Sequence, residues 1–130
     1  MTQHLAALAL VVRDYDEALD FYVGKLGFEL IEDARMSETK RWMLVAPPGA
    51  KEMRLLLAKA DTPEQKTRIG NQTGGRVFLF LHTDDFQRDY EAYRAKGVRF
   101  LATPRQESYG TVAVFVDLYG NKWDLIERRG

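Results

Sequence analysis

The sequence predicts an α+β fold built from two βαβββ modules, because it contains an internal repeat and both copies show the same order of elements. Residues 7–30 read ALALVVRDYDEALDFYVGKLGFEL, and residues 78–100 read FLFLHTDDFQRDYEAYRAKGVRF, with matching aspartate, aromatic and glycine positions. A repeat offset of roughly 70 residues indicates two related modules, because a solenoid needs three or more short repeats. We therefore expect a single domain made of module 1 (about 4–60) and module 2 (about 75–128).

The first module opens with a short apolar run, Leu5–Val12, which predicts a strand buried on both faces. Asp14 follows in the position of a helix N-cap, and Glu17 three residues later completes a capping-box pattern. The helix should end at Gly27, a residue type that commonly terminates helices. The expected buried stripe of this helix consists of Tyr15, Ala18, Leu19, Tyr22 and Leu26.

Three short strands should complete the first module, at Phe28–Asp33, Arg41–Ala46 and Met53–Lys59. Pro47–Gly49 has the composition of a turn between the last two of these strands. Residues 60–75 are polar and rich in glycine, so we expect them to connect the modules, with one short helix from Pro63.

The second module repeats the element order of the first. Asp84 or Asp85 should cap a helix that buries an aromatic face and ends at Gly97. The segment Arg105–Thr111 is polar and predicts a loop, and Leu118–Asn121 predicts a turn. The expected strands of this module are Arg76–Thr83, Val98–Ala102, Thr111–Asp117 and Lys122–Glu127.

Composition excludes several classes of function. Lys plus Arg and Asp plus Glu number 19 each, and no basic block is present, which argues against nucleic-acid and membrane-surface partners. The absence of cysteine excludes thiol chemistry, disulfides and thiolate metal sites. The first apolar stretch is too short to span a membrane, and no signal pattern precedes it. We therefore expect a cytoplasmic soluble protein.

Two segments carry a resemblance to a known family: VVRDYDEALDFYVGKLGFEL in the first module and DLYGNKWDLIE in the second. The second segment is similar to a hairpin motif of the vicinal-oxygen-chelate superfamily, which includes glyoxalase I, bleomycin-resistance proteins, fosfomycin-resistance enzymes and extradiol dioxygenases. The resemblance covers nearly the whole chain. It implies that the modules pair into an open, curved mixed-sheet barrel (glyoxalase-like) around a pocket, and that the protein is a homodimer. One scaffold hosts many reactions in this superfamily, so the fold alone does not define the function.

The resemblance also implies four inward positions that usually hold His or Glu ligands of a divalent metal. In this sequence the four positions are Ala7, Phe78, Asp124 and either Met53 or Leu55. Metal sites of this kind need imidazoles and carboxylates on converging strands, so a single carboxylate predicts that no metal cofactor is bound. A divergent metal site would require Glu52 and His82 to converge with Asp124.

Inward-facing polar and aromatic residues are the candidates for a ligand pocket. Asp124 either forms an ion pair or a hydrogen bond, with Arg76 as a candidate partner, or acts as a pocket acid, base or anchor for a cationic ligand group. Phe78 and Phe80 either pack in the core or form an aromatic pocket wall in place of a metal site. Tyr109 lies in the loop that borders the pocket mouth in the family.

Tryptophan is a large apolar side chain with one hydrogen-bond donor, and either Trp42 or Trp123 is expected to line the pocket. The predicted ligand pocket consists of Ala7, Arg41, Trp42, Arg76, Phe78, Phe80, Tyr109 and Asp124. The candidates for catalysis are Asp124 and His82, because general acid–base chemistry needs a group whose pKa is tuned toward neutrality.

Two functions follow from these expectations. The first is metal-free binding of a small molecule in the barrel cleft, as in bleomycin-resistance proteins. The second is an enzyme of lyase, isomerase or dioxygenase type on the same fold, with a divergent metal site or with metal-free acid–base chemistry. A structural or regulatory module without a ligand is a third interpretation. The expected partners are a small-molecule ligand and a second copy of the chain, with no nucleic acid and no membrane.

Overall fold

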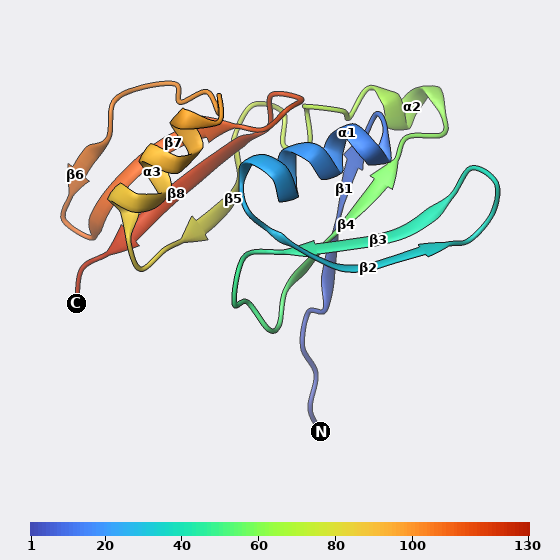
Figure 1. Ribbon diagram of the computed structural model, residues 1–130, viewed down its shortest axis with the longest axis horizontal. Helices are drawn as coiled ribbons and strands as arrows, with labels where there is room; N and C mark the ends of the chain where they lie inside the picture. Colours follow the sequence, from blue (N-terminus) through green and yellow to red (C-terminus); the bar gives the residue numbers. More distant parts are fainter. The chain divides into compact units, whose positions relative to one another are not determined.

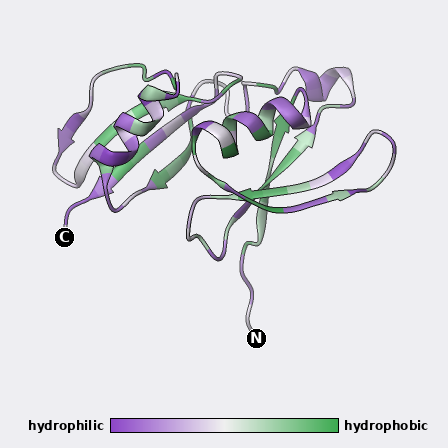
Figure 2. Ribbon diagram, in the orientation of Figure 1, coloured by the Kyte–Doolittle hydropathy of each residue, from purple (hydrophilic) through white to green (hydrophobic).

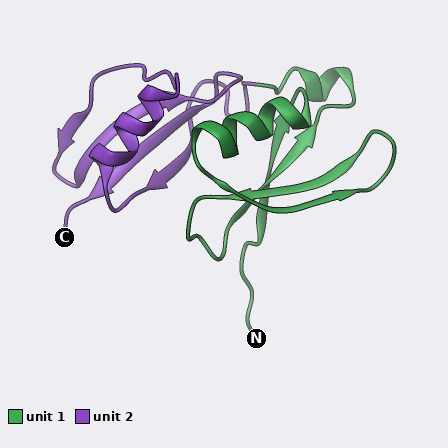
Figure 3. Ribbon diagram, in the orientation of Figure 1, with its two compact units in different colours: residues 1–69 green, residues 70–130 purple.

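A computed structural model describes residues 1–130, which form two compact units, unit 1 (residues 1–69) and unit 2 (residues 70–130) (Figure 3). Both units show the predicted order of strand, helix and three strands, so the α+β fold of two βαβββ modules is confirmed. Each unit contains one four-stranded mixed sheet. None of the helices has the length and apolar character that crossing a membrane would need.

Unit 1 contains four strands and two short helices (Figure 1). Its strands are β1 (Ala7–Val12), β2 (Glu29–Arg35), β3 (Arg41–Ala46) and β4 (Arg54–Lys59). Helix α1 (Tyr15–Leu19) continues directly into a π-helical stretch, η1 (Asp20–Lys25), and α2 (Pro63–Lys66) follows the last strand. The strand order is β1-β4-β3-β2, in which β1 is parallel to β4 and the other pairs are antiparallel.

The first helix begins where the sequence predicts. The Asp14 carboxylate accepts hydrogen bonds of 3.1 Å from the backbone N–H groups of Asp16 and Glu17. The second half of the helix widens into η1, and a π-helical turn inserts an extra residue into the helical repeat. As a result Phe21 joins the buried face, whereas Leu19, which the helical spacing placed there, is only half-buried.

The hydrophobic core of unit 1 lies between this helix and one face of the sheet. Buried and less buried residues alternate along the later part of β1 and along β4, as expected for a sheet with one covered face. The largest buried strand residues are Leu10, Val12, Met43, Val45, Leu55 and Leu57. Ala7 and Ala9 are exposed, so β1 is not buried on both faces as predicted. Figure 2 shows the hydrophobic strands and the hydrophilic tip of the β2–β3 hairpin.

Unit 2 is built in the same way. Its elements are β5 (Val77–His82), α3 (Phe86–Ala95), β6 (Arg105–Glu107), β7 (Gly110–Val116) and β8 (Lys122–Arg128). The strand order is β5-β8-β7-β6, with β5 parallel to β8. Tyr93 of α3 packs edge-on against Phe115 of β7 at 5.4 Å between ring centroids, and Phe115 stacks on Trp123 of β8 at 5.8 Å. Trp123 is therefore a core residue of this unit.

One predicted strand of the second module is wrong. Residues 98–102 form only an isolated bridge, from Phe100 to Phe115, and the remaining strand is β6, inside the segment 105–111 that was expected to be a loop. Pro104 separates the bridge from β6. Proline has no N–H group to donate to a strand ladder, so regular pairing with β7 resumes only after it.

The turn between β7 and β8 is built on two buried polar residues, Asp117 and Asn121. Asp117 Oδ1 accepts hydrogen bonds of 2.9 Å from the N–H groups of Tyr119 and Asn121, and Asn121 Nδ2 donates to Asp117 Oδ2 at 2.9 Å. Asn121 Oδ1 accepts a further bond from the Gln72 N–H at 3.2 Å. The motif segment DLYGN therefore has a structural role, because it fastens the chain before β5 to this turn.

Candidate ligand-binding site

Unit 1 contains a cavity of about 690 Å³ at one end of its sheet. The volume lies within the range of about 300–1,000 Å³ in which proteins hold small organic ligands. The end of β4 and the residues after it form one wall, and the β2–β3 hairpin with the start of β3 forms another. Val11 of β1, Tyr15 of α1 and Gln65 of α2 complete the lining.

Trp42 and Tyr15 are the aromatic residues of the cavity lining. Leu44 pairs with Leu56 of β4, and Trp42 lies two residues before Leu44, so its indole lies on the same open sheet face as Leu56. Ala58 follows on that face and also lines the cavity. Trp42 is 38% exposed, and so large an apolar surface left open to solvent can be buried by a bound molecule.

Arg41 holds this wall in place from the helix-covered side of the sheet. Its guanidinium donates two hydrogen bonds to Asp33, of 2.7 and 3.1 Å, and one of 2.9 Å to Asp16. Its backbone N–H donates to the Tyr15 hydroxyl at 3.1 Å, and its guanidinium lies 5.3 Å from the Tyr15 ring centroid. Arg41 thus joins β2, β3 and α1, and it holds the ring of Tyr15 at the start of β3.

The same contacts change the ionisation of the groups involved. The hydrogen bond from Arg41 lowers the pKa of Asp33, against a smaller opposing effect of burial. The hydrogen bonds to Asp33 and Asp16 raise the pKa of Arg41 above its already high value. Arg41 is therefore a permanently charged structural residue, and its two carboxylate partners more than balance its charge.

The β2–β3 hairpin brings Lys40 to the rim of the cavity. The Ser37 hydroxyl oxygen accepts hydrogen bonds from the N–H groups of Thr39 and Lys40, at 3.3 and 3.1 Å. The Lys40 carbonyl accepts bonds from the N–H groups of Met36 and Ser37. Lys59, at the end of β4, lies on the rim as well. The ammonium groups of Lys40 and Lys59 form no hydrogen bond or ion pair.

The structure divides the predicted pocket residues between the two units. Arg41 and Trp42 line the cavity of unit 1. Ala7 lies in β1 of the same unit, on the open face of the sheet, but it does not line this cavity. The predicted residues in unit 2 are Arg76, Phe78, Phe80, Tyr109 and Asp124.

Asp124 lies in β8, opposite Phe80 of β5. Its Oδ1 atom is buried without a hydrogen-bond partner, and this burial raises the pKa of the carboxyl group, while the charge of Arg105 lowers it. The expected ion pair with Arg76 is wrong. Arg76 precedes the first residue of β5. Arg105 instead pairs with Val112 of β7, on the same sheet face as Asp124, and its charge is the one that lowers the pKa of Asp124.

His82 shares the sheet face of Asp124 but pairs with Ile126, two residues further along β8. His82 and Asp124 form no hydrogen bond with each other, and the Oδ1 atom of Asp124 has no partner. His82 and Phe80 are both exposed, and Phe80 is 62% exposed. The structure therefore brings a carboxyl and an aromatic ring together rather than an aspartate–histidine pair.

The residues at the family's metal positions do not fit a divalent metal. Ala7 pairs with Arg54 in β4, so Arg54 and Leu56 share its sheet face. The expectation of Met53 or Leu55 is wrong, because Leu55 points to the helix-covered face and is buried there. Alanine, leucine and arginine side chains supply none of the imidazole or carboxylate ligands that such metals take. Within each unit, no three His, Asp or Glu side chains gather closely enough to hold an ion.

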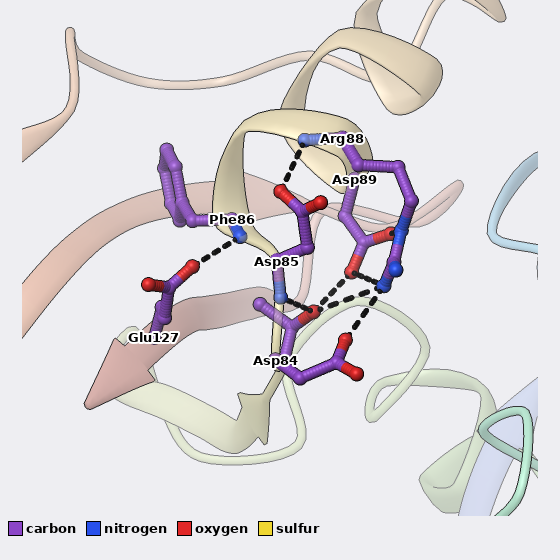
Figure 4. Close-up of polar contacts among 7 residues, drawn as sticks. Asp84, Asp85, Phe86, Arg88, Asp89 and Glu127 are labelled. Atoms are coloured by element: carbon purple, nitrogen blue, oxygen red, sulfur yellow. Dashed lines mark hydrogen bonds and ion pairs between the residues drawn. The ribbon is translucent and has the colours of Figure 1, made fainter. Parts of the chain in front are cut away.

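The charged cluster at the start of α3 is a capping network (Figure 4). Asp85 Oδ1 accepts a hydrogen bond of 3.1 Å from the Arg88 N–H, and Glu127 Oε1 accepts one of 2.7 Å from the Phe86 N–H. The Arg88 guanidinium binds one carboxylate of the preceding loop and one of the helix, both at 3.0 Å. Helix N–H groups and Arg88 thus satisfy these carboxylates, so the cluster fastens the helix rather than forming an open site.

Most of the cavity lining was not predicted from the sequence. Val11, Leu56 and Ala58 have the composition of ordinary strand residues, and Lys40 and Lys59 resemble solvated residues at strand ends. The available signal was the alternation along each strand. Once Ala7 is placed on the open face, Val11 falls on that face too.

Comparison with known proteins identifies related sequences over nearly the whole chain. A model of the glyoxalase/bleomycin resistance protein/dioxygenase superfamily matches residues 3–125. An uncharacterised protein from Shewanella frigidimarina (strain NCIMB 400) is 59% identical over 128 residues, which cover 98% of this chain and 95% of that protein.

Two solved structures are also similar over nearly their whole lengths. UcmS2 superposes with a TM-score of 0.84 at 32% sequence identity, and the match covers 97% of this chain and 98% of UcmS2. TnmS3, an antibiotic binding protein from Streptomyces sp. CB03234, superposes with a TM-score of 0.79 at 30% identity, and the match covers 98% of both chains.

Proposed function

Because this chain belongs to the glyoxalase/bleomycin resistance protein/dioxygenase superfamily, we propose that it is a small-molecule-binding protein whose ligand occupies the cavity of unit 1. The observation that carries the proposal is the combination of a volume of about 690 Å³ with the partly exposed indole of Trp42 in its wall. Val11, Leu56 and Ala58 line the same cavity, so a planar ligand would bury apolar surface against them and the indole.

The relatives support binding as the function. TnmS3 is described as an antibiotic binding protein, and its similarity extends over 98% of this chain. The Arg41 network also supports binding, because it holds Tyr15 and the start of β3 in place before any ligand binds. A wall fixed in advance reduces the entropy lost on binding.

We further propose that the ligand is held without a metal. The open-face positions of the first module carry Ala7, Arg54 and Leu56, and none of them can act as a ligand of a divalent ion. Apolar and aromatic contacts, with polar groups at the rim, would then supply the affinity.

Fluorescence titration tests the location of the ligand. The emission of Trp42 should be quenched by planar aromatic compounds that bind, whereas Trp123 is 2% exposed in the core of unit 2 and should contribute a constant background. A panel of such compounds would be titrated into the wild type, and dissociation constants of the quenchers confirmed by calorimetry. Trp42→Ala should weaken binding by about tenfold or more, since stacked aromatic contacts contribute about 1 kcal/mol beyond the buried area.

Two further variants make this experiment decisive. Leu118→Ala removes an exposed apolar side chain of unit 2, and it should leave binding unchanged. Phe80→Ala tests whether unit 2 contributes to ligand binding, as the sequence predicts for Phe80. If Trp42→Ala bound every compound as tightly as the wild type, the proposed location would be rejected.

Asp124 supports a second candidate function, acid–base catalysis. Its orphaned carboxyl oxygen and raised pKa, next to the exposed ring of Phe80, are properties of a proton-transfer group. Compounds that bind would be incubated with wild-type protein and with Asp124→Asn, and the mixtures analysed by mass spectrometry. Conversion by the wild type alone would establish this function, and unchanged compounds in both mixtures would leave binding as the function.

We also propose that the protein is a homodimer. Strand β1 lies at an edge of its sheet. The segments that lead into β1 and β4 expose apolar side chains, with Leu5 78% exposed and Met53 41% exposed. Exposed apolar groups on an edge strand favour association with another chain. Light scattering after size-exclusion chromatography should give twice the chain mass, and a mass of 14.9 kDa would show a monomer.

A further inference from the structure

We infer that the ligand of the unit 1 cavity is an aromatic anion, an inference that rests on the proposed function and adds the charge of the ligand. The cavity lining contains the cationic side chains Lys40, Arg41 and Lys59, and its one carboxylate is Asp61. The chain as a whole carries no net charge, so this local excess of cations is a property of the cavity.

The cations of the lining differ in how fully they are balanced. Arg41 forms ion pairs with Asp33 and Asp16, so its guanidinium is not counted among the cations that can pair with a ligand. Lys40 and Lys59 form no ion pair, and Asp61 can balance only one of them. Asp16 and Asp33 are not part of the lining, so among the groups that line the cavity two lysines without an ion pair face one carboxylate. An anionic substituent is therefore attracted to these lysines, and a cationic one is repelled.

The hydroxyl groups of the lining favour the same charge. The Tyr15 hydroxyl already accepts a hydrogen bond from the Arg41 N–H, and the Ser37 hydroxyl accepts two from the hairpin backbone. A hydroxyl carries one hydrogen in addition to its acceptor sites, so both residues can still donate to a ligand. A carboxylate, phenolate or sulfonate accepts such bonds and gains more from them than a neutral acceptor does.

The apolar part of the cavity defines the rest of the ligand. A small inorganic anion would leave the indole of Trp42 and the side chains of Leu56 and Ala58 without a partner in a cavity of about 690 Å³. A planar aromatic ring would cover these groups while its acidic substituent reached the lysines at the rim. The ligand class that satisfies both parts is an aromatic compound with an anionic substituent.

Three probes of similar size separate charge from shape: 2-naphthoate, 2-naphthylmethanol and 2-naphthylmethylammonium. Their dissociation constants would be measured by calorimetry with the full chain at neutral pH and low salt. The naphthoate should bind about tenfold more tightly than the alcohol, and the ammonium compound should bind most weakly. Added salt should reduce the preference for the naphthoate, because rim charges are screened.

A matched pair of variants assigns the effect to the rim. The double variant Lys40→Gln/Lys59→Gln should bind the naphthoate and the alcohol equally, with the affinity for the alcohol unchanged. The control Lys51→Gln/Lys96→Gln removes the same charge away from the cavity and should keep the preference. If the alcohol or the ammonium compound bound to the wild type as tightly as the naphthoate, the inference that the ligand is an anion would be wrong, and the proposed binding function would still stand. If none of the three probes bound, the proposed function itself would fail, and this inference with it.

Discussion

The Asp33 carboxylate and the Arg41 guanidinium form a two-point ion pair, with oxygen–nitrogen distances of 2.7 and 3.1 Å. Asp33 lies in β2 and Arg41 in β3, where Arg41 pairs with Arg35, so the ion pair runs diagonally across the hairpin. The two side chains are 29% and 26% exposed. Partial shielding and bidentate geometry make this pair stronger than the about 0–1 kcal/mol that exposed pairs contribute.

Loss of the guanidinium should therefore destabilise unit 1. We expect Arg41→Met to lower the free energy of unfolding by about 1–2 kcal/mol, because Asp33 and Asp16 lose their common partner. Urea denaturation followed by circular dichroism would measure this loss. The control is Arg35→Met, an exposed arginine of the neighbouring strand, which should change stability by less than about 0.5 kcal/mol. Equal losses in the two variants would contradict a special role for Arg41.

The same pair should make stability depend on pH in the acid range. Arg41 lowers the pKa of Asp33 in the folded protein below the ordinary value of 3.8, so the unfolded chain takes up this proton first as the pH falls. The stabilisation is fully present above about pH 4 and is lost as the pH falls through the folded pKa. Unfolding free energies of the wild type and of Asp33→Asn should differ at pH 6 and converge toward pH 2. A difference that stayed constant over this range would exclude the assigned ionisation.

Much of the fold could be predicted because its signals are local. Asp14 and Asp85 cap their helices as expected, since a side-chain oxygen two or three residues before free N–H groups needs no tertiary context. The insertion in η1 and the strand β6 were missed for the opposite reason. A π-helical turn depends on how Phe21 packs in the core, and β6 forms only because β7 offers it a partner.

The candidate site was less predictable than the fold. Arg41 and Trp42 were predicted as pocket residues from their residue types. The sequence does not show that the Arg41 guanidinium is ion-paired with Asp16 and Asp33 and therefore has a structural role. The assignment of Met53 or Leu55 to the open face failed because a shift of one residue moves every side chain of a strand to the other face. Only the observed pairing of Ala7 with Arg54 fixes that register.

Asp124 should respond to pH in the opposite direction to Asp33. Its burial raises the folded pKa above 3.8, so the folded protein holds this proton more tightly than the unfolded chain. The carboxyl therefore costs stability progressively as the pH rises from about 4 through its folded pKa. Asp124→Asn should raise the midpoint of thermal unfolding at pH 7 and should have a smaller effect at pH 4. A variant less stable than the wild type at pH 7 would show that the ionised carboxylate has a stabilising partner.

Two glycines of unit 2, Gly70 and Gly74, allow the cost of a steric clash to be separated from the cost of backbone strain. Gly70 has φ of 74°, and a Cβ atom added there would lie 2.0 Å from the carbonyl oxygen of Tyr119, in the turn before β8. Gly74 has a similar φ of 66°, but a Cβ atom there would meet nothing within 4 Å. Both positions favour glycine, so only the close approach distinguishes them.

We expect Gly74→Ala to cost about 1 kcal/mol, the strain of a left-handed alanine. Gly70→Ala carries the same strain and must also displace the turn, so it should cost more than about 3 kcal/mol. Urea denaturation of both variants would measure the difference. Hydrogen exchange should localise it, because the Gln72 N–H bonded to Asn121 would lose protection in Gly70→Ala alone. If the two variants lost the same stability, the chain before β5 would not depend on its packing against this turn.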